Sequence, residues 1–255
     1  MTKRLFKIAA LGTLMVMVGA VSSVMALPEN RGISLGVGGA ASSRLYKDFK
    51  NDKRYMPIPF VMGELGKFYV DGIKVGVKVV DEQRLTFAVE VSQGSDGYKA
   101  SDSPALKGMK ERKKSIDGGV RITCWSDIGG FELSGAGDLS DTHEGGEATL
   151  KYMIPIQTPV MTVVPYVGST WRSKKKVAYY FGVRDVEAKA GRKAYEPGAD
   201  VSGFVGLDVE IPVTRRLKMV VGGKAEYLGD EVHNSPIVNE DYVASAYAGM
   251  ILTMF

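Results

Sequence analysis

The chain has 255 residues, a length that one β-barrel domain can occupy. Charged residues make up 24% of it and the mean hydropathy is −0.03, which excludes a bundle of membrane helices. The formal net charge is +4, but subtracting the three positive charges of Lys3, Arg4 and Lys7, which lie in a segment we expect to be removed, leaves +1. The mature charge therefore gives no reason to expect nucleic-acid binding.

Residues 1–26 have the pattern of a secretory signal peptide. The basic residues Lys3, Arg4 and Lys7 precede an apolar core over residues 8–21, and small or aliphatic residues lead to Ala26. The core is short for a membrane span of about 20 residues. We therefore expect cleavage after Ala26, with the mature domain covering residues 27–255.

Ten segments of the mature chain are then strand candidates: most carry apolar side chains at alternate positions, the period of a β-strand, whereas residues 159–171 and 244–255 are more uniformly apolar. The alternation is clearest in residues 201–211 and 217–227, which are joined by a tight break. Each of these runs has about the 9–11 residues that a tilted membrane strand requires. A soluble β-sandwich would also alternate. The remaining strands are expected at residues 32–41, 69–80, 84–92, 115–125, 128–137, 147–154, 159–171 and 244–255.

The lengths of the connectors favour a membrane barrel over a sandwich. Long polar connectors at 42–67, 93–114, 138–146, 172–200 and 229–241 alternate with short ones at 81–83, 126–127, 155–158 and 212–215. An up-and-down barrel of the outer membrane has long outer loops and tight periplasmic turns. The sequence thus predicts an all-β, transmembrane, antiparallel up-and-down barrel of about ten strands, in a chain that we expect to be a monomer.

Two short apolar pieces do not fit this scheme as spanning strands. Residues 56–62 are interrupted by Pro57 and Pro59, and residues 177–183 lie inside a long connector. Either they extend the wall above the membrane or the barrel has twelve strands. The prolines favour the first interpretation.

Charged residues of both signs occupy the alternate positions that we expect to face the lumen, so they can pair across it. About ten strands leave a narrow or filled interior, which disfavours a general porin but permits a path for small solutes. These inward positions are Lys74, Lys78, Glu90, Arg121, Glu132, Lys151, Asp208, Glu210, Lys218 and Glu226.

Catalytic and metal sites are weakly indicated. His143 and His233 are the only histidines, and we interpret both as solvated loop residues, because no nucleophile motif surrounds the nearby Ser140 or Ser235. A divalent cation could be held by Asp138, Asp141, His143 and Glu144, but their spacing is not that of an EF-hand loop. We therefore expect no catalytic residue, cofactor or metal.

Two other groups of residues suit the membrane surface. A basic run just before the strand at 115–125 could meet the phosphates of lipopolysaccharide, although a solvated loop face is an equal alternative; it comprises Lys107, Lys110, Arg112, Lys113 and Lys114. Aromatic residues near strand ends could form the interfacial girdles, with ordinary packing as the alternative; these are Tyr69, Tyr152, Tyr166, Trp171 and Tyr227.

Two loop segments carry a family resemblance. The first contains Gly97, Tyr98, Ser101, Asp102, Ser103, Leu106, Gly108, Met109 and Arg112. The second contains Tyr180, Phe181, Gly182, Glu187, Tyr195, Pro197 and Gly198. With residues 68–72 as a third match, the mature chain resembles the MipA/OmpV family of outer-membrane proteins. Asp200 departs from the glycine usual there.

The resemblance implies a location and, more loosely, a role. It implies residence in the outer membrane, in contact with membrane lipid and lipopolysaccharide. The family's namesake, the MltA-interacting protein, is regarded as a scaffold that joins a lytic transglycosylase to a bifunctional murein synthase. We therefore expect a non-enzymatic structural or interaction protein, with a narrow channel for small solutes as the alternative.

Overall fold

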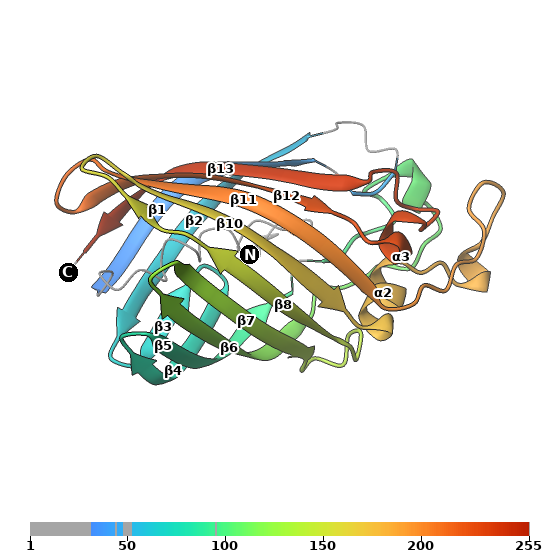
Figure 1. The fold of residues 1–255 in the computed structure, drawn as a ribbon. Coiled ribbons are helices and arrows are strands. Elements are labelled where there is room, and N and C mark those ends of the chain that lie inside the picture. The colour runs from blue at the N-terminus through green and yellow to red at the C-terminus, as the bar shows by residue number, and fades with distance from the viewer. Residues whose placement is uncertain (1–31, 44, 48–52, 95, 255) are drawn as a thin grey trace, which may run out of the picture.

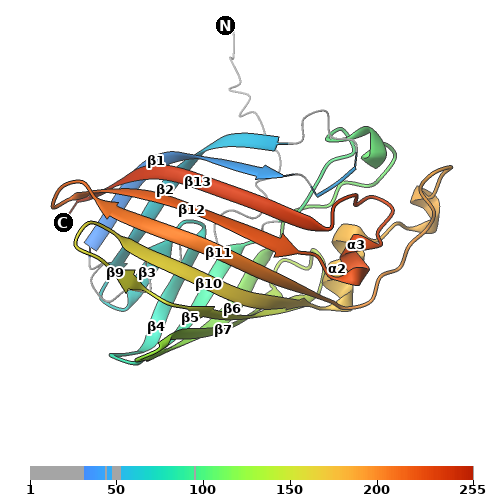
Figure 2. The ribbon, with the colours of Figure 1, turned by 45° about the horizontal axis from the view of Figure 1, so that its top comes forward.

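The computed structural model describes residues 32–43, 45–47, 53–94 and 96–254. The expected signal peptide and cleavage site lie outside these residues. Figure 1 shows a sheet that curls around a central axis, and Figure 2 shows the helices gathered at one end of it. This end, formed by the long loops, is called the loop end, and the opposite one the turn end.

In the described part of the chain, twelve antiparallel strands close the barrel, and one further strand of two residues pairs only with the start of β10. Closure comes from the pairing of the first strand with the last, and of β10 with β11. The strands are β1 (Gly32–Ser43), β2 (Lys53–Leu65), β3 (Phe68–Asp71), β4 (Lys74–Glu82), β5 (Leu85–Gln93), β6 (Ile116–Ser126), β7 (Gly129–Asp138), β8 (Gly146–Met153), β9 (Ile156–Gln157), β10 (Thr162–Arg172), β11 (Asp200–Pro212), β12 (Leu217–Tyr227) and β13 (Tyr242–Thr253).

This arrangement confirms the all-β antiparallel barrel, and twelve is the count that the chain adopts. The predicted strand at 69–80 is in fact a hairpin, because Gly72 has a φ of +61° and turns β3 back into β4. The predicted connector at 42–67 contains β2. These two differences account for the two additional strands.

The prolines of β2 do not interrupt its ladder with β1. The amide of Gly72 donates to the carbonyl of Val61, so the peptide groups of Val61 point toward β3. Peptide groups alternate in direction along a strand, and those of Pro57 and Pro59 therefore also point away from β1. Their missing N–H groups cost no hydrogen bond in the β1–β2 pair.

The apolar piece at 177–183 is a helix and not an extension of the wall. α2 (Lys174–Phe181) begins after Ser173, whose hydroxyl oxygen accepts from the amide of Lys176 at 3.4 Å. Among the described residues, three further short helices lie in the outer loops: η1 (Pro104–Leu106), η2 (Asp185–Glu187) and α3 (Asp230–His233). No helix in the described part of the chain is both long and apolar enough to cross a bilayer.

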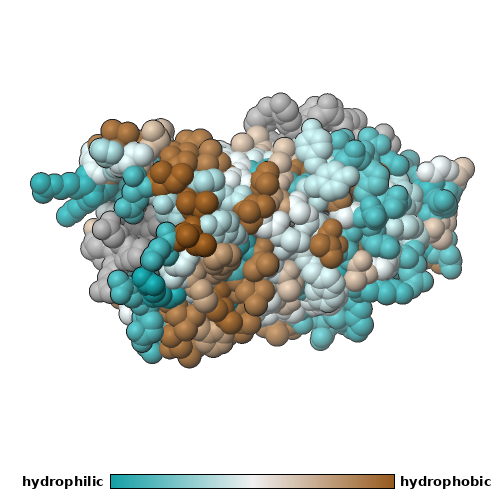
Figure 3. Space-filling model, in the orientation of Figure 1, coloured by the Kyte–Doolittle hydropathy of each residue, from teal (hydrophilic) through white to brown (hydrophobic). Residues whose placement is uncertain are grey.

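On the face drawn in Figure 3, apolar residues gather over the half of the barrel nearer the turn end, and hydrophilic residues lie over the loops. Leu65, Val75, Leu133 and Val205 are examples of exposed, outward-facing strand residues. A lipid-facing wall requires this exposure, which would be costly in water.

Candidate functional site: the barrel lumen and its outer cap

Buried apolar side chains of the outer loops form a cap over the loop end of the lumen. They come from the connectors that follow β1, β5, β10 and β12 and from the start of β13, and they pack together although some are more than a hundred residues apart. We call this set the outer cap: Leu45, Tyr46, Tyr98, Leu106, Met109, Val177, Tyr180, Phe181, Val183, Leu228, Val232, Ile237, Val238 and Val243.

A buried ion pair fixes two loops of the cap to each other. The Arg112 guanidinium donates to both Glu187 carboxylate oxygens, at 3.0 Å and 2.8 Å, and also to the carbonyl of Tyr179 at 2.6 Å. Burial would raise the pKa of Glu187, but the hydrogen bonds from Arg112 and from the amides of Lys110 and Arg184 outweigh it and hold that pKa at about 2. The pair is therefore ionised at neutral pH and satisfied on every side.

The first motif segment builds the loop that carries Arg112. Tyr98 pairs with Arg112 through both backbone hydrogen bonds. Gly97 has a φ of +141°, and a Cβ there would lie 2.9 Å from the Arg112 carbonyl oxygen. Ser103 caps η1 by accepting from the amide of Ala105. The remaining motif residues serve local structure: Asp102 accepts from the Lys99 amide, Leu106 and Met109 are buried, Gly108 has a φ of +88°, and Ser101 is exposed.

The second motif segment anchors α2 and the loop that follows it. The hydroxyl of Tyr180 donates to the Lys113 carbonyl at 3.1 Å, which joins the segment to the first motif. The carbonyl of Phe181 accepts from the Ser235 hydroxyl at 2.6 Å. Gly182 closes α2, Pro197 is buried, and Glu231 of α3 accepts from the Gly198 amide through its carboxylate and from the Tyr195 hydroxyl through its carbonyl.

Asp200, the one departure from the motif, has a structural task. Its buried carboxylate accepts from the amides of Glu231 at 3.1 Å and Val232 at 3.3 Å, the first turn of α3. Free amides at a helix N-terminus favour a carboxylate partner. Asp200 therefore links the start of β11 to α3 in a way that glycine could not.

Paired charges line one side of the lumen below the cap. Glu90 interacts with Lys74 at 3.6 Å and with Arg121 at 3.3 Å, and it also accepts from the hydroxyl of Tyr69 at 2.7 Å. Glu132 lies 3.0 Å from Lys151. These residues lie on neighbouring strands from β3 to β8, so the inward charges pair along the wall and not across the lumen as the sequence suggested.

Other polar pairs line the opposite side. Glu226 contacts Arg172 at 2.6 Å and Lys224 at 2.8 Å. Near the middle of the strands, Asp208 accepts from the Tyr247 hydroxyl at 2.9 Å. Toward the turn end the expected inward charges also pair: Lys78 with Glu64 and Asp81, and Lys218 with Glu210. Apolar side chains fill further lumen between β1, β2, β12 and β13: Ala40, Ile58, Phe60, Met62, Val220, Tyr247 and Ile251.

A cavity of about 230 Å³ remains in the lumen beneath the cap. Its lining joins both groups of ion pairs to cap residues such as Phe181 and Leu228. Asp96, in the loop after β5, also lines it. Burial raises the pKa of Asp96, against the lowering effect of Lys176 and Arg172. The site is thus a charged pocket with an apolar roof.

Sequence comparison places this barrel among known proteins. The family model of the MltA-interacting protein MipA matches residues 35–253. The chain belongs to the MipA family. Omp26La of Vibrio anguillarum is 32% identical over 141 residues, 55% of each protein. OmpV of Vibrio cholerae is 30% identical over 142 residues, 56% of this chain and 55% of the relative.

The match to these curated relatives thus spans about half their length. A 24 kDa outer membrane protein of Pasteurella multocida is 22% identical over 227 residues, 80% of this chain and 83% of the relative. The solved structure of the NanC porin aligns over 87% of this chain and 100% of the porin chain, with 9% sequence identity and a TM-score of 0.48. This MipA-family chain is an outer-membrane β-barrel protein.

The basic run of this MipA-family barrel divides into two kinds of residue. Arg112 is only 2% exposed and is held by Glu187, so its predicted contact with a lipid headgroup is wrong. The prediction overlooked that a guanidinium inside a motif can be a structural donor. Lys107, Lys110 and Lys113 are exposed and Lys114 is half-buried, and their contact with lipid stays a prediction.

His143 is not the solvated loop residue that the sequence suggested. It is buried, with its Nε2 3.7 Å from Asp117 and its Nδ1 accepting from the Gly145 amide at 3.0 Å. Ser140 donates to Asp138, whose carboxylate also accepts from the amides of His143 and Glu144 and so organises the turn. His233 lies 3.1 Å from Asp241 and is partly exposed.

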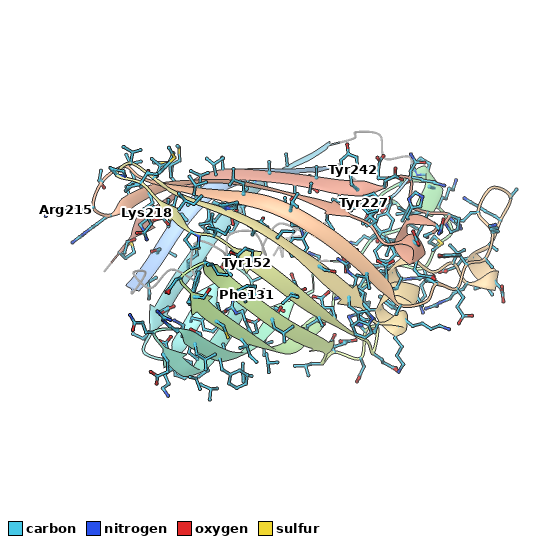
Figure 4. All side chains as sticks on the ribbon, in the orientation of Figure 1. Phe131, Tyr152, Arg215, Lys218, Tyr227 and Tyr242 are labelled. Atoms are coloured by element: carbon cyan, nitrogen blue, oxygen red, sulfur yellow. The ribbon has the colours of Figure 1, made fainter. Side chains whose placement is uncertain are left out.

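Aromatic residues mark both ends of the lipid-facing wall. Figure 4 shows Phe131 and Tyr152 side by side on β7 and β8, and Tyr227 and Tyr242 at the loop end of β12 and β13. Trp171 is also exposed at the loop end of β10. Tyr69 and Tyr166, which the sequence offered for the same girdles, are buried. Their places near strand ends could not reveal which face they occupy.

Proposed function

We propose that this MipA-family barrel is a non-enzymatic structural and interaction protein that acts as a scaffold between a lytic transglycosylase and a bifunctional murein synthase. The observation that supports this role best is the filling of the lumen by paired charges such as Glu132 with Lys151, below a packed outer cap. A lumen that is narrowed by paired charges and closed at one end by the cap favours a role for the surface over transport.

The periplasmic rim offers a surface for such partners. Short turns face the periplasm in barrels of this kind. Three turns that follow one another around the rim expose Ile128, Val160 and Val213, with exposed fractions of 69%, 61% and 53%. Arg215 and Arg216 are exposed in the β11–β12 turn, and Figure 4 shows Arg215 at the same end. Exposed apolar side chains beside basic ones suit a protein partner with acidic residues around an apolar patch.

A pull-down in detergent tests the scaffold role. The bait is the full chain, and the prey are a purified lytic transglycosylase and a purified bifunctional murein synthase. We expect the triple substitution of Ile128, Val160 and Val213 to Asp to lower retention of at least one enzyme about tenfold. Val186→Asp is the matched control, because Val186 is 91% exposed in an outer loop. Failure of the wild-type chain to retain either enzyme would contradict the proposal.

A narrow channel for small solutes is the second candidate. The luminal cavity lined by Lys74, Glu90 and Arg172 favours it, because paired charges can rearrange around a passing ion. Conductance in planar bilayers distinguishes the two roles. The scaffold role predicts no steady current from the wild type, and persistent single-channel steps would support the channel.

We also propose that exposed lysines of the outer loops contact lipopolysaccharide. Lys107, Lys110 and Lys113 project from the loops near the outer rim, where phosphate groups of the headgroup would lie. Replacing the three by Gln should reduce co-purified lipopolysaccharide without changing heat-modifiable gel mobility. The matched control replaces Lys67, Arg215 and Arg216 at the turn end.

A further inference from the structure

The barrel wall has a notch beside β2. β2 has 13 residues and pairs with β1 along almost its whole length, whereas its other neighbour, β3, has four residues and pairs only with Met62–Leu65. Beyond the hydrogen bond from Gly72 to Val61, no described strand pairs with that edge of β2. Next to β2, the barrel wall therefore extends only as far toward the loop end as the β3–β4 turn, whereas β2 itself extends further.

The prolines keep this edge from pairing with another strand. The peptide groups of Pro57 and Pro59 point toward the notch, as shown above for Val61, and proline has no N–H to donate. Two of the donors that an added strand would need are thus missing. Prolines at alternate positions on an edge disfavour the addition of a strand. The sequence of β2 therefore keeps this gap in the strand pairing open.

The notch faces apolar surroundings on the outside and the luminal cavity on the inside. Val61 on β2, Val75 on β4 and Val91 on β5 are exposed on the outer face of the wall around it. On the inner side, Ile73 of the β3–β4 turn and Lys74 at the start of β4 line the cavity. A molecule dissolved in the hydrocarbon of the bilayer would therefore meet the cavity sideways.

The outer cap makes this sideways route the favoured one. Loops on both sides of the notch meet above it, where the hydroxyl of Ser103 donates to the carbonyl of Lys47. The roof of the cavity is formed by buried cap residues such as Phe181 and Val232. Passage along the barrel axis would require the cap to unpack, whereas passage through the notch would not.

The cavity also selects the charge of its occupant. Among the acids that line it, Glu90, Glu132, Glu147 and Glu226 each have a Lys or Arg within 4.0 Å, and Asp117 faces His143. Asp96 has no such partner among the described residues. The lining therefore has one carboxylate to offer to a cation, next to the aromatic rings of Phe181 and Phe204.

We propose that the notch between β2 and the β3–β4 turn is a lateral portal, through which an amphiphilic amine passes from the bilayer into the cavity and pairs with Asp96. The apolar part of the ligand suits the membrane-side approach, and its protonated amine suits a carboxylate that has no Lys or Arg within 4.0 Å in the described part of the chain. This inference goes beyond the scaffold role and does not depend on it.

The test uses the full chain in lipid nanodiscs and three dansyl-labelled C11 chains that end in an amine, an alcohol or a carboxylate. Fluorescence is measured against empty nanodiscs. We expect the amine to bind at least about tenfold more tightly than the other two, and Asp96→Asn to remove that preference. Asp185→Asn, in an outer loop, is the charge-matched control.

A second variant tests the route itself. Ile73→Trp adds bulk at the notch, and we expect it to lower the association rate constant of the amine about tenfold. Val205→Trp, on the lipid-facing side of β11, is the bulk-matched control. Heat-modifiable gel mobility confirms that each variant folds. Equal binding of the three probes, or an unchanged Asp96→Asn, would overturn the ligand class, and an unchanged rate in Ile73→Trp would overturn the portal.

Discussion

Arg112 and Glu187 form a two-pronged ion pair inside the outer cap, although 75 positions separate them in the chain. The pair joins the loop after β5 to the loop after β10, and its guanidinium also lies 5.8 Å from the ring centre of Tyr98. A charge pair so deeply buried costs much when one partner is lost, because the other stays buried without compensation.

Glu187→Gln should loosen the cap without unfolding the barrel. The change removes a negative charge from beside Arg112, and breaking a buried pair in this way typically costs about 3–5 kcal/mol. We expect faster cleavage of the outer loops by proteinase K in proteoliposomes, with heat-modifiable mobility retained. Glu196→Gln is the control, because Glu196 pairs with Lys174 on the exposed surface. Equal cleavage of both variants would show that the buried pair does not hold the cap.

The same pair predicts how the cap responds to acid. The pKa of Glu187 is about 2 in the folded chain, below its ordinary value of 4.5. A carboxylate whose pKa is lower in the folded chain than in the unfolded chain stabilises the fold at pH values above the unfolded-state pKa. This stabilisation is lost as the pH falls toward and through the folded-state pKa. Protection of the outer loops from pepsin should therefore decrease between about pH 4.5 and 2. In Glu187→Gln this part of the pH dependence should be absent.

The ion pairs that line the lumen around Glu132 should be energetically coupled. Glu132 contacts Lys151 at 3.0 Å and lies 3.9 Å from Arg121, so Glu132→Gln leaves two cations with a weaker partner. We expect a lower urea midpoint of unfolding in detergent. Combining it with Lys151→Met should recover part of that loss, because the cation that has lost the Glu132 carboxylate is then removed. Strict additivity of the two effects would contradict the coupling.

Asp200→Gly, which restores the usual family residue, should free the start of α3. Loss of a capping carboxylate costs about 1 kcal/mol. We expect faster hydrogen exchange at the amides of Glu231 and Val232, both of which donate to Asp200. Exchange in β11 itself should change little. Unaltered exchange at the two amides would show that α3 is held by its other contacts.

The sequence predicted most of the wall because strand alternation is a local property. Residues 201–211 and 217–227 showed their two faces directly, and β11 and β12 follow them. β2 was missed because proline normally argues against a strand. Only the pairing pattern shows that Pro57 and Pro59, which lack an N–H group, face the side of β2 that has no hydrogen-bonded neighbour there. The hairpin of β3 and β4 was read as one strand because Gly72 sits within continuous alternation.

The site was less predictable than the wall. The inward charges were identified from period two, but their partners depend on strand register, which the sequence did not supply. Arg112 and Glu187 both occurred in the motif segments, and that was the one signal of their pairing. Nothing in the sequence distinguished a buried His143 from an exposed one, because its loop is short and polar on both sides.

The seam between β1 and β13 has a consequence for biogenesis. Ser34 lies opposite Thr253, so the cylinder is completed by segments 219 positions apart. Contacts of such separation form late, because the intervening chain must first be ordered. Until the last strand is delivered, β1 and β12 each present an unsatisfied ladder to their surroundings. Shielding of these two strands until β13 pairs with them would therefore protect the chain from wrong strand pairing during insertion.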